Sequence, residues 1–163
     1  RDQQNQSRAS VPYRLLDLWA DVLADKKSAD ITILTQRRED AGRGTRPPQG
    51  NSQAEQLEEL CAHSAVLCAA SPVLRAMLRG NMCESTSREI RLTDHSRLAV
   101  EVFLSLLYTA SLPDPQDPTV ATLLEALAVA HCWQVEHVLE QLERRVVDRL
   151  DLEHFEEVAE AAL

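Results

Sequence analysis

Residues 61–85 read CAHSAVLCAASPVLRAMLRGNMCES, and this pattern predicts two short apolar helices joined at a serine and a proline. Ser71 suits the N-cap of the second helix, because its hydroxyl can accept a hydrogen bond from an amide of the first turn. Pro72 suits the first helical position, where the N–H that proline lacks would have no helical partner. Gly80 is expected to end this helix. Met82 follows on a predicted turn, where an apolar side chain of a soluble protein needs an explanation.

Three strands are predicted around this pair of helices. Residues 29–35, ADITILT, are rich in β-branched side chains and place two isoleucines on one face. Residues 57–62, LEELCA, are interpreted as a second strand that pairs with the first, although a helix would also suit them. Residues 88–94, REIRLTD, alternate apolar and polar and predict a third strand. Residues 36–56 have no apolar period and are expected to form a mobile surface insertion.

An amphipathic helix is predicted in YRLLDLWADVLADKK, near the start of the chain. Leu15, Leu18, Trp19 and Val22 fall on one stripe of this helix. An apolar stripe of this kind must be covered, either by its own domain or by a second copy of the chain.

Apolar residues three and four positions apart predict further helices over residues 96–112, 119–133, 135–150 and 152–163. Asp117 and Pro118 are expected to start the second of these. The helix over 96–112 is apolar nearly all round and should be central and buried. Three strands cannot enclose a core alone, so the sheet must lie over the helical cluster in an α+β fold.

The 163 residues suffice for one ordinary domain with a proper core. The net charge of −9 argues against a nucleic-acid-binding surface, which relies on clustered Lys and Arg. Much of the excess acid lies beyond residue 134 and is interpreted as a solvated helix face, with a docking surface for a basic partner as the alternative. No apolar run is long enough to span a bilayer, so no membrane role is expected.

Four cysteines without paired spacing are typical of reduced, partly buried thiols. This pattern predicts an intracellular protein, cytoplasmic or nuclear. Because the chain begins at Arg1 rather than at a methionine, we expect it to be a fragment of a longer protein.

No catalytic site, metal or cofactor is predicted. Cys61 and His63 are too close together for a zinc pair, and no second pair follows at a suitable spacing. His131, Cys132 and His137 lie close together in the sequence, but His131 and Cys132 point to different helix faces. The two histidines are therefore interpreted as capping or surface residues. The sequence therefore does not indicate an enzyme.

Asp30 and His63 flank the first two predicted strands. Asp30 starts the first strand, and His63 precedes the first short helix. We interpret them as a structural pair that ties strand to helix. A functional acid–base pair is the alternative, but no nucleophile accompanies it.

The sequence resembles the BTB (POZ) domain over about residues 15–150. The matching positions are Asp30, Ala62-His63, Val66-Leu67, Ser71, Glu84-Ser85, Asp94 and Tyr108-Thr109. Leu74 and Leu78 stand where the family usually carries Phe, a change of volume that a core can absorb. The resemblance implies a BTB/POZ fold, a helical cluster capped by a small three-stranded sheet with extra helices at both ends.

The same resemblance implies how the chain is divided. Residues 1–10 would be a disordered lead-in, and residues 11–150 the BTB/POZ domain with its insertion at 36–56. Residues 151–163 resemble the start of the helical 3-box or BACK extension that follows BTB domains in cullin-3 adaptors.

The resemblance also implies a protein–protein interaction module that forms a homodimer, with the stripe of the first helix buried across the two-fold axis. The chain is most similar to MATH-BTB adaptors, which recruit the N-terminal domain of cullin-3 with a hydrophobic–x–Glu triplet. Met82-Cys83-Glu84 matches this triplet, and Tyr108 lies where the family often has another contact. The substrate of the ubiquitin ligase would bind through another domain.

Two alternatives stand beside this interpretation. Met82 could instead fold back as a hydrophobic contact that ends the preceding helix. The chain could also be a module for self-association alone, in a transcriptional or scaffolding protein. The adaptor, by contrast, needs both Met82 and Glu84 exposed.

Overall fold

The computed structural model of the protein describes residues 13–36, 57–112 and 117–149, with the side chains of residues 13–15 and 36 left out. The described residues form a three-stranded sheet in the order β2-β1-β3. β1 (Ile31–Gln36) pairs antiparallel with β2 (Leu57–Ala62) and parallel with β3 (Glu89–Ser96). The predicted hairpin is confirmed, and residues 57–62 form a strand rather than a helix.

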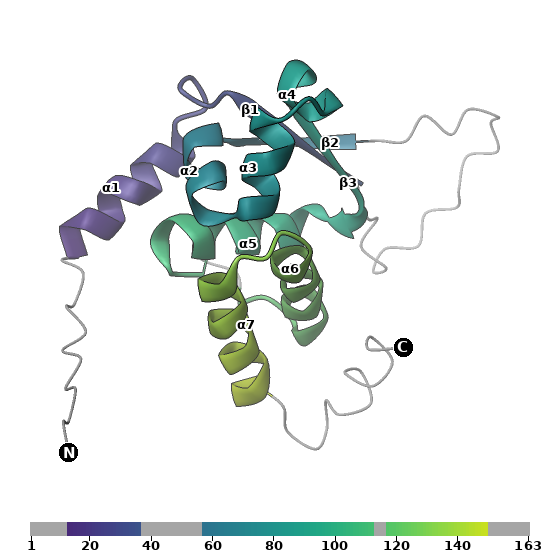
Figure 1. The fold of residues 1–163 in the computed structure, drawn as a ribbon. Helices are drawn as coiled ribbons and strands as arrows, with labels where there is room; N and C mark the ends of the chain where they lie inside the picture. Colours follow the sequence, from purple (N-terminus) through teal and green to yellow (C-terminus); the bar gives the residue numbers. More distant parts are fainter. Residues whose placement is uncertain (1–12, 37–56, 113–116, 150–163) are drawn as a thin grey trace, which may run out of the picture.

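Three helices lie in the connection between β2 and β3, and four more make up the rest of the described fold. α2 (Ser64–Ala70), α3 (Pro72–Arg79) and the short α4 (Cys83–Ser87) lie between β2 and β3. α1 (Tyr13–Ala24) precedes the sheet, and α5 (Arg97–Thr109), α6 (Val120–Cys132) and α7 (Glu136–Arg149) follow it. In Figure 1, α5 runs beneath the sheet and the α2–α3 pair, and α6 and α7 lie below α5. This arrangement confirms the predicted α+β class.

The core lies between the sheet and α5 and continues between α5, α6 and α7. α5 buries seven side chains, as its apolar composition predicts. Phe103 of α5 meets Trp133, at the end of α6, edge to face at a centroid distance of 5.1 Å. Leu74 and Leu78 of α3 are buried in the same cluster, so leucine fills both positions where the family usually has phenylalanine.

The junction of α2 and α3 has the capping that its sequence predicts. The fully buried Ser71 hydroxyl accepts a hydrogen bond from the Leu74 amide at 3.0 Å and donates one to the Trp133 carbonyl at 2.5 Å. Ser71 therefore starts α3 and also fastens it to the end of α6. At Gly80, which ends α3, an added Cβ would collide with the carbonyl oxygen of Ala76.

The start of α6 corrects one prediction. Thr119, not Asp117, is the N-cap, and its hydroxyl accepts a hydrogen bond from the Thr122 amide at 3.2 Å. Asp117 instead forms an ion pair with Arg149 of α7. The lead-in at 1–10, nearly all of the insertion at 36–56 and the extension at 151–163 lie outside the described residues.

Candidate functional site

The outer face of α1 carries apolar side chains that the described residues do not cover. Leu18 is 60% exposed and Trp19 is 40% exposed. Val22 is half-buried against the core, and the side chain of Leu15 lies outside the described part. Of the four stripe residues predicted from sequence, two are therefore exposed and one is shared with the core.

Tyr108 of α5 links this face to the corner between β2 and α2. Trp19 meets its ring edge to face at a centroid distance of 6.5 Å. The tyrosine hydroxyl accepts a hydrogen bond from the His63 amide at 3.0 Å and lies 3.1 Å from Nδ1 of the same residue. His63 Nε2 lies 3.0 Å from the hydroxyl of Ser28, in the loop after α1. The network thus ties α1, α2 and α5 together.

Tyr108 is only 5% exposed, which limits its predicted role as a contact for a partner. Desolvation raises the pKa of its hydroxyl to about 12, although the hydrogen bond from the His63 amide opposes this change. A buried neutral hydroxyl with two hydrogen-bond partners serves the fold.

Asp30 and His63 both hold the start of α2, but separately. The Asp30 carboxylate accepts hydrogen bonds from the Ser64 amide at 2.7 Å and from the Ser64 hydroxyl at 2.6 Å. Within the described residues no hydrogen bond joins Asp30 to His63. Asp30 connects the start of β1 to α2 through Ser64, whereas His63 is bound to Tyr108 and Ser28. Their joint role as a structural pair that ties strand to helix stays a prediction.

Hydrogen bonding also sets the charge state of Asp30. Desolvation acts to raise the pKa of the carboxyl, but the two bonds from Ser64 and the nearby Arg88 outweigh it and hold that pKa below its ordinary value. The Arg88 guanidinium lies 3.7 Å from the carboxylate. This ion pair is half exposed and contributes little by itself.

Met82 stands at the N-cap of α4 and is 52% exposed. Its carbonyl accepts a hydrogen bond from the Ser85 hydroxyl at 2.7 Å, and Arg88, with φ of 60°, ends the helix. The Arg88 carbonyl accepts from the Thr32 amide at 2.9 Å, which fastens α4 to β1. Hydrogen bonds thus hold the backbone of residues 82–88, here called the α4 corner, and Met82 is exposed on it. This exposure disfavours the alternative in which Met82 folds back.

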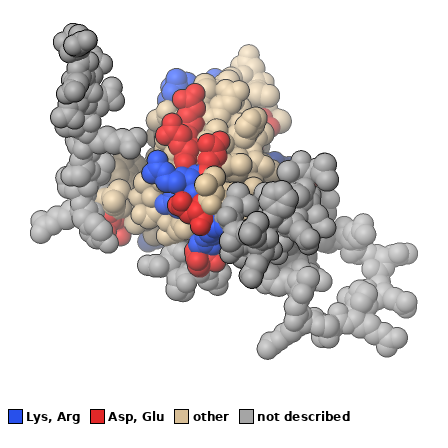
Figure 2. Space-filling model, turned by 90° about the horizontal axis from the view of Figure 1, so that it is seen from below, with Lys and Arg blue, Asp and Glu red and all other residues tan. Residues whose placement is uncertain are grey.

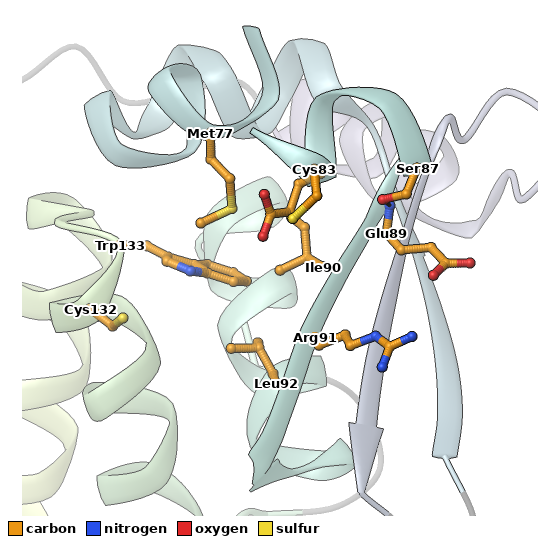
Figure 3. Close-up of a pocket in the computed structure, with 10 residues that line it drawn as sticks. Met77, Cys83, Ser87, Glu89, Ile90, Arg91, Leu92, Cys132 and Trp133 are labelled. Atoms are coloured by element: carbon orange, nitrogen blue, oxygen red, sulfur yellow. Dashed lines mark hydrogen bonds between the residues drawn. The ribbon is translucent and has the colours of Figure 1, made fainter. Parts of the chain in front are cut away.

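A cavity of about 460 Å³ opens beside this corner (Figure 3). It lies between α3, α4, β3 and the end of α6. The residues that line it are Met77, Cys83, Glu84, Ser87, Glu89, Ile90, Arg91, Leu92, Cys132 and Trp133.

Glu84 contributes a carboxylate to this cavity. Its Oε2 atom is buried and has no hydrogen-bond partner among the described residues. Glu84 is thus not the fully exposed acid that the triplet predicts, since one of its oxygens is turned away from solvent. Sequence reasoning found this residue but not its orientation, because no pattern of residue types specifies a side-chain rotamer.

Other features of the described residues concern metal ligands, membrane-spanning helices, thiols and charge. No group of three potential metal ligands occurs among them, and none of their helices is long and apolar enough to cross a membrane. All four cysteines are free; Cys68 is buried and Cys61 is partly buried, but Cys83 and Cys132 are exposed. On the face seen in Figure 2, acidic and basic side chains are intermixed without a continuous basic area.

Comparison with known proteins agrees with this architecture. The family model described as BTB/POZ domain matches residues 53–150, more than half of the chain. The chain belongs to the BTB/POZ family. As a BTB domain, it is a module for protein–protein interaction.

Two plant proteins illustrate the relationship. The BTB domain is 37% identical to the BTB/POZ domain-containing protein At4g08455 of Arabidopsis thaliana over 89 residues, which are 55% of this chain and 35% of that protein. It is 32% identical to the BTB/POZ and TAZ domain-containing protein 2 of the same plant over 106 residues, which are 62% of this chain and 28% of that protein. The chain therefore spans about a third of the length of these relatives.

Proposed function

We propose that this BTB domain is the homodimeric part of a substrate adaptor that recruits a cullin-3 ubiquitin ligase. The adaptor is not itself a catalyst, and its substrate binds through another domain. The observation that carries the proposal is Met82, 52% exposed at the start of α4 within a hydrophobic–x–Glu triplet. An exposed apolar side chain on an anchored backbone suits an interface hot spot, because little conformational entropy of the backbone is lost on binding.

The uncovered face of α1 supports the homodimer. Leu18 and Trp19 expose apolar surface next to the half-buried Val22, with Leu15 on the same helix. A two-fold interface uses the same patch on both subunits, so one exposed stripe is enough to make a self-complementary contact. Trp19 rests against Tyr108, which fixes the orientation of its ring for packing.

Self-association without cullin binding is the second candidate. The observation that favours it is the orientation of Glu84, whose Oε2 is buried instead of facing a partner. The dimer face of α1 is common to both candidates, so only the α4 corner separates them.

Calorimetric titration with the N-terminal domain of cullin-3 tests the proposal. The parent should bind one cullin domain per chain, and Met82→Ala should raise Kd by about tenfold or more, as expected for a hot spot. Val147→Ala is the matched control, because Val147 on α7 is also apolar and is 65% exposed. If the folded parent dimer does not bind, the adaptor function is wrong and self-association remains.

Light scattering tests the dimer. Leu18→Glu should reduce the mass from two chains to one, because it places a charge in the buried stripe. Val147→Glu should leave the mass unchanged. A parent that has the mass of a single chain would contradict the dimer.

A further inference from the structure

We propose that the free edge of β3 binds an extended peptide of a partner protein, which adds a strand to the sheet. An apolar side chain of this peptide would enter the cavity between β3 and Trp133. The inference goes beyond the proposed contact with the cullin, because the peptide is held by the backbone of β3.

The first argument is the backbone of β3, which is an edge strand of the described sheet. In a parallel pair, alternate residues of a strand direct both their N–H and their C=O to the neighbouring strand. The Thr32 amide donates to the Arg88 carbonyl at 2.9 Å, so the even-numbered residues of 88–92 face β1. The backbone N–H and C=O groups of Glu89 and Arg91 therefore point to the free edge.

Most of these edge groups lack a partner. The Glu89 amide donates to the Ser87 hydroxyl at 3.2 Å. The Glu89 carbonyl and both backbone groups of Arg91 form no hydrogen bond within the described residues. An extended peptide supplies donors and acceptors at the spacing that such an edge requires. The other edge strand, β2, differs, because Arg97 already donates to its Glu59 carbonyl at 3.3 Å.

The second argument is the cavity of about 460 Å³ beside this edge. The four consecutive residues 89–92 line it, so it follows the strand. Figure 3 shows Ile90 and Leu92 on the side of Trp133, and the two charged side chains of this segment on the other side. Directly opposed residues of two strands place their side chains on the same face. Peptide residues opposite Ile90 and Leu92 would therefore point into the cavity.

The third argument is charge. Glu89 and Arg91 are exposed and form no ion pair within the described residues. Opposite charges in directly opposed positions stabilise a pair of strands, and antiparallel pairing is the more stable orientation. An antiparallel peptide would carry an acid opposite Arg91 and, two positions later, a base opposite Glu89. The ligand is thus an extended segment with the order apolar, acidic, apolar, basic.

A second copy of the chain suits this edge less well. Antiparallel pairing of two β3 strands could oppose Glu89 to Arg91, but it would then also oppose Ile90 to Ile90. Ile90 is 3% exposed because its side chain is packed in the core of its own subunit. It cannot fill the cavity of another subunit, whereas the side chains of a separate peptide can.

Amide hydrogen exchange of the protein alone is the first test. The Ile90 and Leu92 amides are directed to β1 and should exchange slowly, whereas the Arg91 amide should exchange at least about tenfold faster. An Arg91 amide that is as well protected as its neighbours would show that the edge is already occupied, and it would overturn the inference.

Titration with acetyl-Thr-Ile-Glu-Ile-Lys-amide is the second test. We expect saturable shifts of the indole N–H signal of Trp133, which lines the cavity, and slower exchange of the Arg91 amide. N-methylation of the peptide's glutamate removes the N–H that would donate to the Arg91 carbonyl and should weaken binding by about tenfold or more. N-methylation of its second isoleucine is the matched control and should have little effect, because that N–H points away from β3.

Charge reversal tests the register. The parent should prefer this peptide to acetyl-Thr-Ile-Lys-Ile-Glu-amide by about threefold, and Glu89→Arg/Arg91→Glu should reverse the preference. Met82→Ala should leave peptide binding unchanged, so the outcome does not depend on the cullin. No saturable binding, equal effects of the two N-methyl groups, or a charge preference that does not reverse would overturn the inference.

Discussion

Ser71 and Glu84 are both polar, lie on neighbouring elements and contribute buried oxygen atoms, but the fold treats them differently. The Ser71 hydroxyl makes two hydrogen bonds, one to the amide of Leu74 and one to the carbonyl of Trp133. Glu84 Oε2 makes none within the described residues. The comparison separates a buried polar group that joins two elements of the fold from one that has no hydrogen-bond partner among the described residues.

Ser71→Ala should have the largest effect on stability. The substitution removes the cap of α3 and leaves the Leu74 amide and the Trp133 carbonyl buried without this partner. We expect the free energy of unfolding to fall by about 2–4 kcal/mol in urea titrations.

Ser96→Ala is the matched control for Ser71→Ala. Ser96 caps α5 with a single bond from the Ala99 amide at 3.3 Å and is only half-buried. Its removal should lower the free energy of unfolding by about 1 kcal/mol. Equal losses in the two variants would contradict the special role of Ser71.

Tyr108→Phe should have the next largest effect. The ring contact with Trp19 can remain, but the His63 amide and Nδ1 lose their common partner. The free energy of unfolding should fall by about 1–2 kcal/mol, while the affinity for the cullin domain should not change. A loss of cullin affinity with unchanged stability would instead make Tyr108 a direct contact.

Asp30 should make stability depend on acid pH. Its pKa in the folded protein is lower than its ordinary value of 3.8, so the stabilisation is present above that value and is lost as the pH falls through the folded pKa. Because the side chain is 46% exposed, the effect should be below about 1 kcal/mol.

Urea titrations from about pH 6 to about pH 2 measure how the stability depends on pH. Asp30→Asn should lose less stability over this range than the parent. Asp17→Asn, on the exposed side of α1, is the control and should follow the parent. If the free energy of unfolding falls equally with pH in Asp30→Asn and in the parent, Asp30 is not the source of the acid dependence.

Ala110→Gly should have a small stabilising effect. Ala110 ends α5 with φ of 55° and ψ of 17°, a left-handed conformation that glycine adopts without steric cost. We expect a net gain of about 0.5 kcal/mol, since the greater entropy of glycine in the unfolded chain offsets part of the relief. Ala128→Gly, at an exposed position of α6, should instead lose about 1 kcal/mol.

Most of the fold could be predicted because its signals are local. Ser71, Pro72 and Gly80 determine where α3 begins and ends, and the alternation of residues 88–94 shows the third strand. Thr119 was missed as the cap of α6 because Asp117 and Pro118 offered an equally good local pattern. Arg149, 32 residues away in sequence, pairs with Asp117 instead.

The candidate site was predicted less completely, because it depends on contacts between distant segments. The triplet pointed to Met82 and Glu84, but the inward orientation of Glu84 arises where α3, α4, β3 and α6 meet. Tyr108 was expected to contact a partner, although burial against His63 and Trp19 could be seen only in three dimensions. The separate partners of Asp30 and His63, namely Ser64 and Tyr108, could likewise be seen only in three dimensions.

The stability of Glu84→Gln tests most directly whether the fold leaves this carboxylate free. The substitution removes a charge that makes no hydrogen bond through Oε2, so the free energy of unfolding should stay the same or rise by up to about 1 kcal/mol. Urea titration of this variant beside the parent measures the difference. A loss of more than about 1 kcal/mol would mean that the fold itself needs the Glu84 carboxylate, and it would contradict the contrast with Ser71.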